Sequence, residues 1–105
     1  MSRRVHLRRA AEGDIDSHFL FIAEENVAAA IRFHDAARSA LDRLGEMPEI
    51  GSRRQTSSSA LTGLRMWPIP DFPSYLIFYF SHEHGIDVVR VLHARRDLGS
   101  ALAEA

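Results

Sequence analysis

The sequence predicts an α+β protein in which a helical hairpin packs on one face of a mainly antiparallel sheet, in the order β-α-α-β-β-β. Residues 63–98 carry this prediction most strongly, because they hold three apolar runs of strand length that are rich in aromatic and β-branched residues. Upstream of them, two segments repeat their apolar residues at three- and four-residue steps, which is the spacing of an amphipathic helix.

Four strands are expected, and turn-forming residues separate the last three of them. The strands are residues 4–8, 64–69, 75–80 and 86–92. In the first strand polar and apolar residues alternate, so Val5 and Leu7 should face inward. Two prolines and an aspartate at 70–73, and a glycine-containing segment at 81–85, have the composition of turns. Connections this short join neighbouring strands, so the last three strands should form an antiparallel meander.

The first helix is expected over residues 11–25. Its inward stripe consists of Ile15, Phe19, Ile22 and Ala23, with Asp16 and Glu24 pointing away. Asn26 interrupts the pattern and suits a tight corner between helices. It tolerates the left-handed conformation that ends one helix, and its side chain can cap the next.

The second helix is expected over residues 27–47, with Gly45 and Pro48 as its stop signals. Its inward positions are Ala30, Phe33, Ala37, Ala40 or Leu41, Leu44 and Met47. A connection of about one residue forces the two helices into an antiparallel hairpin. Residues 49–60 are Ser-rich and lack apolar periodicity, so they should form a surface loop. The tail at 95–105 holds few large apolar residues and should form no more than a short helix.

Length and composition limit the classes of protein to consider. A chain of 105 residues supports one domain, and 46% apolar with 26% charged residues is typical of a soluble globular protein. No apolar run approaches the roughly 18–20 residues that a membrane span needs, and residues 1–4 do not begin a signal peptide. Cysteine is absent, which excludes disulfides and thiol chemistry. A cytoplasmic location is therefore expected.

The charge pattern argues against a nucleic-acid-binding protein. All thirteen basic residues are arginine, and the net charge is −1. Proteins that hold nucleic acid usually carry a basic excess, because neutralisation of phosphates supplies much of the affinity. Direct sequence-specific binding of nucleic acid is therefore not expected. Nor can any lysine act as a general acid or base.

Arg65, Arg90 and His93 are the candidates for catalysis. Arginine binds phosphate through paired hydrogen bonds, and histidine transfers a proton near neutral pH. In a regular strand Arg90 would share a face with Val88 and Leu92, whereas His93 would lie on the opposite face. Arg90 and His93 could then converge only if the strand bulges or ends between them. This pattern favours structural roles for these residues and leaves catalysis as the alternative.

Four further residues are candidates for partner binding. Trp67 and Phe72 lie beside prolines and either pack at the sheet edge or face a partner. Arg95 and Arg96 follow the last strand, where they form either a solvated turn or a contact with a partner. Asp97 could act there as the N-cap of the residues that follow.

His82, Glu83 and His84 have the residue types of a metal site. Two histidines two residues apart on an exposed turn, with no cysteine and no evident third ligand, make a poor zinc site. The chain also lacks a glycine-rich loop of the kind that cradles phosphate. We therefore expect no metal and no cofactor.

A series of short motifs runs through most of the chain. They are Asp14-Ile15 with Phe21-Ile22-Ala23-Glu24, Asn26 to Ala30 with Arg32-Phe33, Met47-Pro48 with Gly51, Gly63-Leu64-Arg65, Tyr75 to Tyr79, and Val91-Leu92-His93 with Arg96-Asp97-Leu98. In order and spacing they resemble ParE toxins of the RelE/ParE superfamily of bacterial toxin–antitoxin systems, although proline is common there at the position of Val27.

The resemblance implies one RelE/ParE-like toxin domain over residues 1–105, of the plasmid-stabilisation type. It implies neutralisation by a cognate antitoxin encoded beside the toxin, in a complex with two copies of each chain or more. RelE-like members of the superfamily cut mRNA on the ribosome, whereas ParE-like members impair DNA gyrase. The missing lysine and the near-neutral charge favour a gyrase inhibitor that acts by protein binding rather than as an enzyme. A RelE-like ribosome-dependent mRNA endoribonuclease, or an inactive antitoxin-binding module, remain the alternatives.

Overall fold

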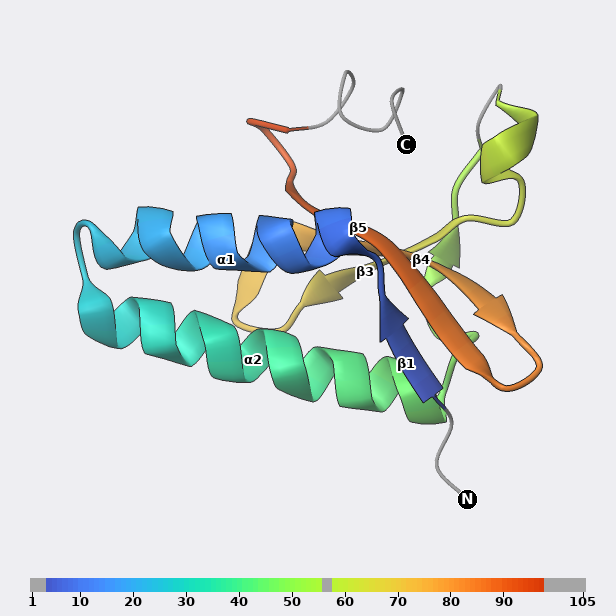
Figure 1. The fold of residues 1–105 in the computed structure, drawn as a ribbon, viewed down its shortest axis with the longest axis horizontal. Coiled ribbons are helices and arrows are strands. Elements are labelled where there is room, and N and C mark those ends of the chain that lie inside the picture. Colours follow the sequence, from blue (N-terminus) through green and yellow to red (C-terminus); the bar gives the residue numbers. More distant parts are fainter. Residues whose placement is uncertain (1–3, 56–57, 98–105) are drawn as a thin grey trace.

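The computed structural model describes residues 4–55 and 58–97 and places a helical hairpin over one face of a five-stranded sheet (Figure 1). The elements are β1 (Arg4–Leu7), α1 (Arg9–Ala23), α2 (Val27–Glu46), β2 (Ser52–Arg53), the 3-10 turn η1 (Ser59–Leu61), β3 (Arg65–Ile69), β4 (Phe72–His82) and β5 (Gly85–His93). This is the α+β architecture that the sequence predicts. Within the described ranges, no helix is long and apolar enough to cross a membrane.

The sheet has the order β1-β5-β4-β3-β2, with β1 parallel to β5 and all other pairs antiparallel. The predicted meander of β3, β4 and β5 is confirmed. The prediction that 49–60 is entirely loop is wrong, since Ser52–Arg53 pairs with β3 and Ser59–Leu61 forms a 3-10 turn. A two-residue edge strand needs only backbone hydrogen bonds, so it leaves no apolar alternation in the sequence.

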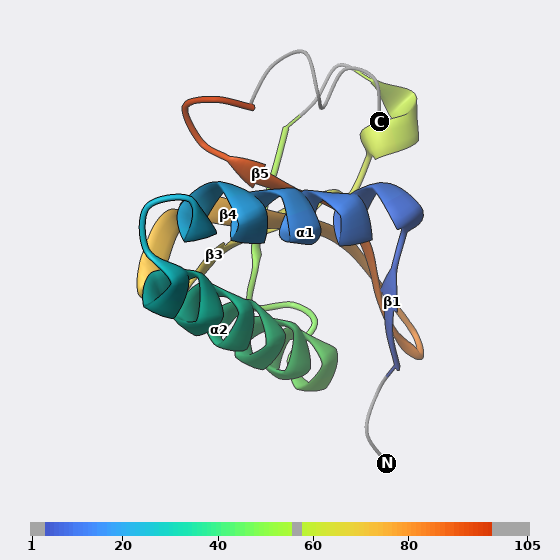
Figure 2. The ribbon, with the colours of Figure 1, turned by 60° about the vertical axis from the view of Figure 1, so that its left-hand side comes forward.

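Both helices lie side by side in one layer, as Figure 2 shows from a second direction. On α2 the predicted core positions are buried, and these are Ala30, Phe33, Ala37, Ala40, Leu41 and Leu44. Gly45 does not end α2, which continues to Glu46, and Met47 is 49% exposed rather than inward. Asn26 caps α2 as predicted, because its Oδ1 accepts the Ala29 amide at 2.9 Å. Its φ of −156° is extended rather than left-handed.

The inward stripe of α1 differs from the prediction. Ala11 and His18 are the buried residues of this helix, and Ile15 and Ile22 pack beside them. His18 Nε2 donates a hydrogen bond to the carbonyl oxygen of Val91 at 2.8 Å, which satisfies the polar atom inside the core. Phe19 is displaced from this stripe to the flank of the helix.

The apolar residues form one cluster on each face of the sheet. The helix-side cluster includes Val88 and Val91 of β5, whereas Val89 and Leu92 belong to the outer cluster around Phe78, which is fully buried. Regular alternation is broken because the pairing of β4 with β5 shifts between Phe78 and Tyr79, which inserts one extra residue into β5. The predicted grouping of Arg90 with Val88 and Leu92 on one face is therefore wrong.

Candidate partner-binding site

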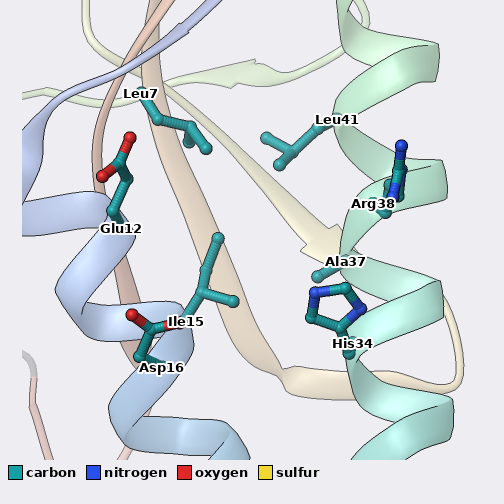
Figure 3. A pocket seen from close by; sticks show the side chains of 8 residues that line it. All are labelled: Leu7, Glu12, Ile15, Asp16, His34, Ala37, Arg38 and Leu41. Atoms are coloured by element: carbon teal, nitrogen blue, oxygen red, sulfur yellow. The ribbon is translucent and has the colours of Figure 1, made fainter.

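A groove of about 320 Å³ lies between α1 and α2, next to the end of β1 (Figure 3). Four apolar residues, buried or half-buried, form its floor, and these are Leu7, Ile15, Ala37 and Leu41. Four exposed polar residues form its rim: Glu12 and Asp16 lie on α1, and His34 and Arg38 lie across the gap on α2. The groove thus offers an apolar floor between an acidic wall and a basic wall.

The two walls form no ion pair with each other within the described residues. Glu12, Asp16 and Arg38 have no oppositely charged group within 4.0 Å there, and the carboxylate near His34 is that of its helix neighbour Asp35, at 3.9 Å. Exposed charges of opposite sign on facing walls can each attract a complementary charge on a partner.

The groove continues as an apolar surface toward the hairpin tip. On α2, Val27 and Ile31 precede His34 and Arg38 at steps of three and four residues, so all four occupy one stripe of the helix. Val27 is 60% exposed and Ile31 51%. On α1, the ring of Phe19 meets His34 edge-to-face at 6.3 Å between centroids. The amphipathic surface therefore extends along most of the hairpin.

The sequence predicts part of this groove. Its four floor residues were expected to face inward and Asp16 to point away, whereas Glu12, His34 and Arg38 were not singled out as binding candidates. What the sequence does not show is which flanks of the two helices face each other.

A second polar cluster lies in the turn that follows β5. His93 Nδ1 accepts the backbone amides of Arg95 and Arg96 at 3.1 and 3.3 Å. These amides stand two and three residues downstream, where a helix N-cap side chain finds its donors. Asp97 Oδ2 accepts the backbone amide of His93 at 2.8 Å, and the residues that Asp97 was expected to cap lie outside the described part of the chain. Burial, together with the charge of Arg96, lowers the pKa of His93 below its ordinary value, so the neutral ring is favoured.

Arg96 lies on aromatic rings in this turn. Its guanidinium is 4.0 Å from the centroid of the Phe21 ring on α1, and its Nη2 donates to the Tyr75 hydroxyl of β4 at 3.1 Å. Arg95 is exposed. Of the candidate residues, the structure thus brings His93, Arg95 and Arg96 together with the buried His18, whose ring is 4.8 Å from that of Tyr75.

The three catalytic candidates do not form one site. Arg65 donates to the carbonyl oxygens of Glu49 and Gly51 at 3.1 and 2.7 Å. Arg90 forms a paired contact with Asp14 of α1, at 2.7 and 2.8 Å. Arg65 lies opposite Tyr79 of β4 and His93 opposite Tyr75, and four strand residues span about 13 Å.

Trp67 and Phe72 are half-buried and pack against the helix-side cluster. The rings of Phe72 and Phe33 meet edge-to-face at 5.4 Å, whereas Trp67 Nε1 is buried without a hydrogen-bond partner in the described structure. The partner-binding role of these two residues stays a prediction. Glu83 and His84 form the exposed β4–β5 turn, and nowhere in residues 4–55 and 58–97 do three potential metal ligands gather.

Comparison with known proteins places this geometry in a family. A solved structure described as "Chromosomal ParDE TA system from P. aeruginosa" matches with a TM-score of 0.70 and 13% sequence identity. The match covers 90% of this chain and 98% of the other, and at this identity it supports the fold alone. No curated protein matches the sequence. Residues 5–98 match the family model of the ParE toxin of the type II toxin–antitoxin system parDE. The chain therefore belongs to the ParE toxin family.

Proposed function

We propose that this protein is the toxin of a type II toxin–antitoxin system in the cytoplasm, that a cognate antitoxin neutralises it, and that it inhibits DNA gyrase by binding rather than by catalysis. The observation that carries the proposal is the groove between α1 and α2, with its apolar floor and its acidic and basic walls, which form no ion pair with each other in the described residues. Such a groove suits a protein segment, since an amphipathic helix presents apolar and charged side chains in the same order.

The groove supports a specific mode of antitoxin binding. A segment that is disordered when free would fold into the groove with apolar side chains on Ile15 and Leu41. Basic side chains of the segment would face Glu12 and Asp16, and an acidic side chain would face Arg38. We expect a stable complex that contains two copies of each chain or more.

The test of this mode is co-expression with the product of the neighbouring reading frame, followed by measurement of the dissociation constant. Arg38→Glu replaces the arginine of the groove by a third acidic group beside Glu12 and Asp16, so it should weaken binding by about tenfold or more. Arg32→Glu makes the same charge change on the same helix outside the groove, and it should have little effect. If both variants bind as tightly as the wild type, the antitoxin does not use this groove.

The separation of the three candidate catalytic residues within the described part of the chain supports action by binding. Ribonuclease chemistry requires groups that move protons and groups that stabilise charge around one phosphate. Here Arg65 and Arg90 hold other parts of the chain, and the Nδ1 atom of His93 already accepts two amides. His93 Nε2 could still serve as an acid, so a RelE-like ribonuclease is the second candidate.

Two assays separate the candidates. Expression without antitoxin should stall replication while mRNA stays intact, and purified protein should inhibit supercoiling by gyrase. Codon-phased cleavage of mRNA that disappears in His93→Ala would instead establish the ribonuclease. Antitoxin binding with neither activity would identify an inactive binding module.

A further inference from the structure

The guanidinium of Arg96 is fixed in place and still has hydrogen-bond donors to offer. It rests on Phe21 and donates through Nη2 to the Tyr75 hydroxyl. A guanidinium has five N–H donors, so most of its hydrogen-bonding capacity remains. No carboxylate lies within 4.0 Å of it in the described chain, because the neighbouring Asp97 binds the His93 amide instead.

The backbone beneath Arg96 is fixed as well. The His93 ring holds the amides of Arg95 and Arg96, and Asp97 returns a hydrogen bond to the His93 amide. The Asp97 amide also donates to the His93 carbonyl oxygen at 3.0 Å. An arginine held at both its backbone and its guanidinium loses little conformational freedom when it binds an anion, and this favours tight recognition.

An exposed apolar band connects Arg96 with the groove. Successive helix residues are rotated by about 100°, so Phe19, Leu20 and Phe21 follow one another around the outer side of α1. Phe19 contacts His34 at the groove, and Phe21 carries Arg96 on the other flank. Between them Leu20 is 64% exposed, and Phe21 itself is 54% exposed. We call these three residues the α1 band.

We propose that one continuous antitoxin segment fills the groove, crosses the α1 band and places a carboxylate on Arg96. This inference rests on the proposed function, because it names the chemistry by which the antitoxin of that system is held. A carboxylate fits the site better than the phosphate of a nucleic acid. The path to Arg96 is apolar, Asp97 is adjacent in the chain, and the whole protein carries a net charge of −1.

The test is a titration of purified toxin variants with the antitoxin from the neighbouring reading frame. Arg96→Gln should raise the dissociation constant about 10- to 100-fold, the range for a lost charge-assisted hydrogen bond. Arg96→Lys keeps the charge but loses the planar fork, so it should restore only part of the affinity. Arg95→Gln is the matched control, because Arg95 is the exposed neighbour without a ring contact, and it should change the constant less than about threefold.

Substitutions at His93 test the positioning of Arg96. Asparagine carries its side-chain oxygen close to the position of Nδ1, so His93→Asn should hold the two amides and keep most of the affinity. His93→Leu cannot accept them, and it should weaken binding even where its thermal unfolding matches that of His93→Asn.

The carboxylate is found by changing each acidic residue of the antitoxin to its amide. One change should lose its effect in the Arg96→Gln background, which is the signature of a direct pair in a double-mutant cycle. Wild-type binding with an unchanged Arg96→Gln constant would overturn the inference and leave the proposed function intact. Displacement of the antitoxin by a single-stranded RNA oligonucleotide, in an Arg96-dependent manner and with no coupled carboxylate, would also overturn it. Failure of wild-type toxin to bind any product of the neighbouring frame would instead refute the proposed function.

Discussion

Tyr79→Phe tests how the connection after α2 is held. The Tyr79 side chain is fully buried in β4, and its hydroxyl accepts the Gly51 amide at 2.9 Å and donates to the Pro48 carbonyl oxygen at 2.8 Å. Phenylalanine keeps the ring and removes both bonds. An unsatisfied buried polar group costs about 1–3 kcal/mol, so the two that Tyr79→Phe leaves should cost about 2–6 kcal/mol in all.

The assay is unfolding in urea, in which the slope of the unfolding free energy against urea concentration should stay constant while the midpoint falls. Tyr75→Phe is the control. Tyr75 lies in the same strand, but its hydroxyl accepts only from the exposed Arg96, so its loss should cost less than about 1 kcal/mol. Hydrogen–deuterium exchange at the backbone amide of Gly51 should become faster in Tyr79→Phe and stay unchanged in Tyr75→Phe. A loss below about 0.5 kcal/mol in Tyr79→Phe would show that water replaces the hydroxyl without cost.

The same hydroxyl gives the stability a dependence on alkaline pH. Burial raises the pKa of Tyr79 above 10.0, although the Gly51 hydrogen bond and the charge of Arg65 oppose the shift. The folded state therefore favours the protonated hydroxyl. Its contribution is complete below pH 10 and is lost as the pH rises through the folded pKa. Tyr79→Phe should lack this alkaline loss.

Three further predictions concern packing, backbone conformation and acid. Phe78→Ala should cost about 3–5 kcal/mol in chemical unfolding, because Phe78 is fully buried in the outer cluster; a loss under about 1 kcal/mol would contradict this packing. Gly85→Ala should detach β1, because the added methyl group would overlap the Arg4 carbonyl oxygen and because φ at Gly85 is 153°. Gly63→Ala is the control: its φ is 89° but the space around it is open, so it should lower the free energy of unfolding by only about 1–2 kcal/mol in thermal melts. Because the pKa of His93 is lowered, its contribution to stability is complete above pH 6.5 and is lost as the pH falls toward the pKa of the folded state. His93→Asn should therefore reduce the difference in unfolding free energy between pH 7 and pH 5. The variant keeps the other groups that act on this position, which are Arg95, Arg96, Asp97 and His18.

The helices and β1 could be predicted because their apolar residues repeat with the period of each structure. The strands β3 to β5 could be predicted because they are apolar runs of strand length, rich in aromatic and β-branched residues. Both signals are local, and this explains the failures. The bulge in β5 depends on the pairing with β4, and the residues around Arg90 carry no local sign of it. Regular strand geometry therefore predicts an alternation of faces there that the structure does not have. The short strand β2 and the turn η1 depend on backbone hydrogen bonds, which any residue can supply.

His18 shows a different limit. With Ala11, Ile15 and Ile22 it occupies the inward stripe at helix spacing, so the spacing alone predicts a buried position. The residue type argues against burial, because histidine is buried only where a partner satisfies its ring nitrogen. That partner is the carbonyl oxygen of Val91 in β5, 73 residues away, and sequence spacing gives no information about a contact of this range.

The candidate site was predicted only in part for a related reason. Arg95 and Arg96 could be singled out as charged residues after a strand, but their support by Phe21 and Tyr75 depends on how α1 crosses the sheet. Likewise, the groove arises where two amphipathic helices meet, and the charges on each helix alone look like an ordinary solvated surface.

The polar residues of this protein fall into two groups, those that hold the fold together and those that line the groove, and substitutions in the two groups should have different effects. Arg65 holds the connection after α2, Arg90 joins α1 to β5, and His93 orders the turn that carries Arg96. If one of these residues bound a phosphate instead, it would give up its present hydrogen bonds. A backbone carbonyl, the Asp14 carboxylate or two backbone amides would then lack a partner, so catalysis would reduce the stability of the fold at each position. The side chains of Glu12, Asp16 and Arg38 form no ion pair in the described part of the chain, so their substitution should change partner affinity while the free energy of unfolding stays within about 0.5 kcal/mol of the wild type. Unfolding and binding measured on the same set of variants would therefore separate the residues that hold the fold from those that choose the partner.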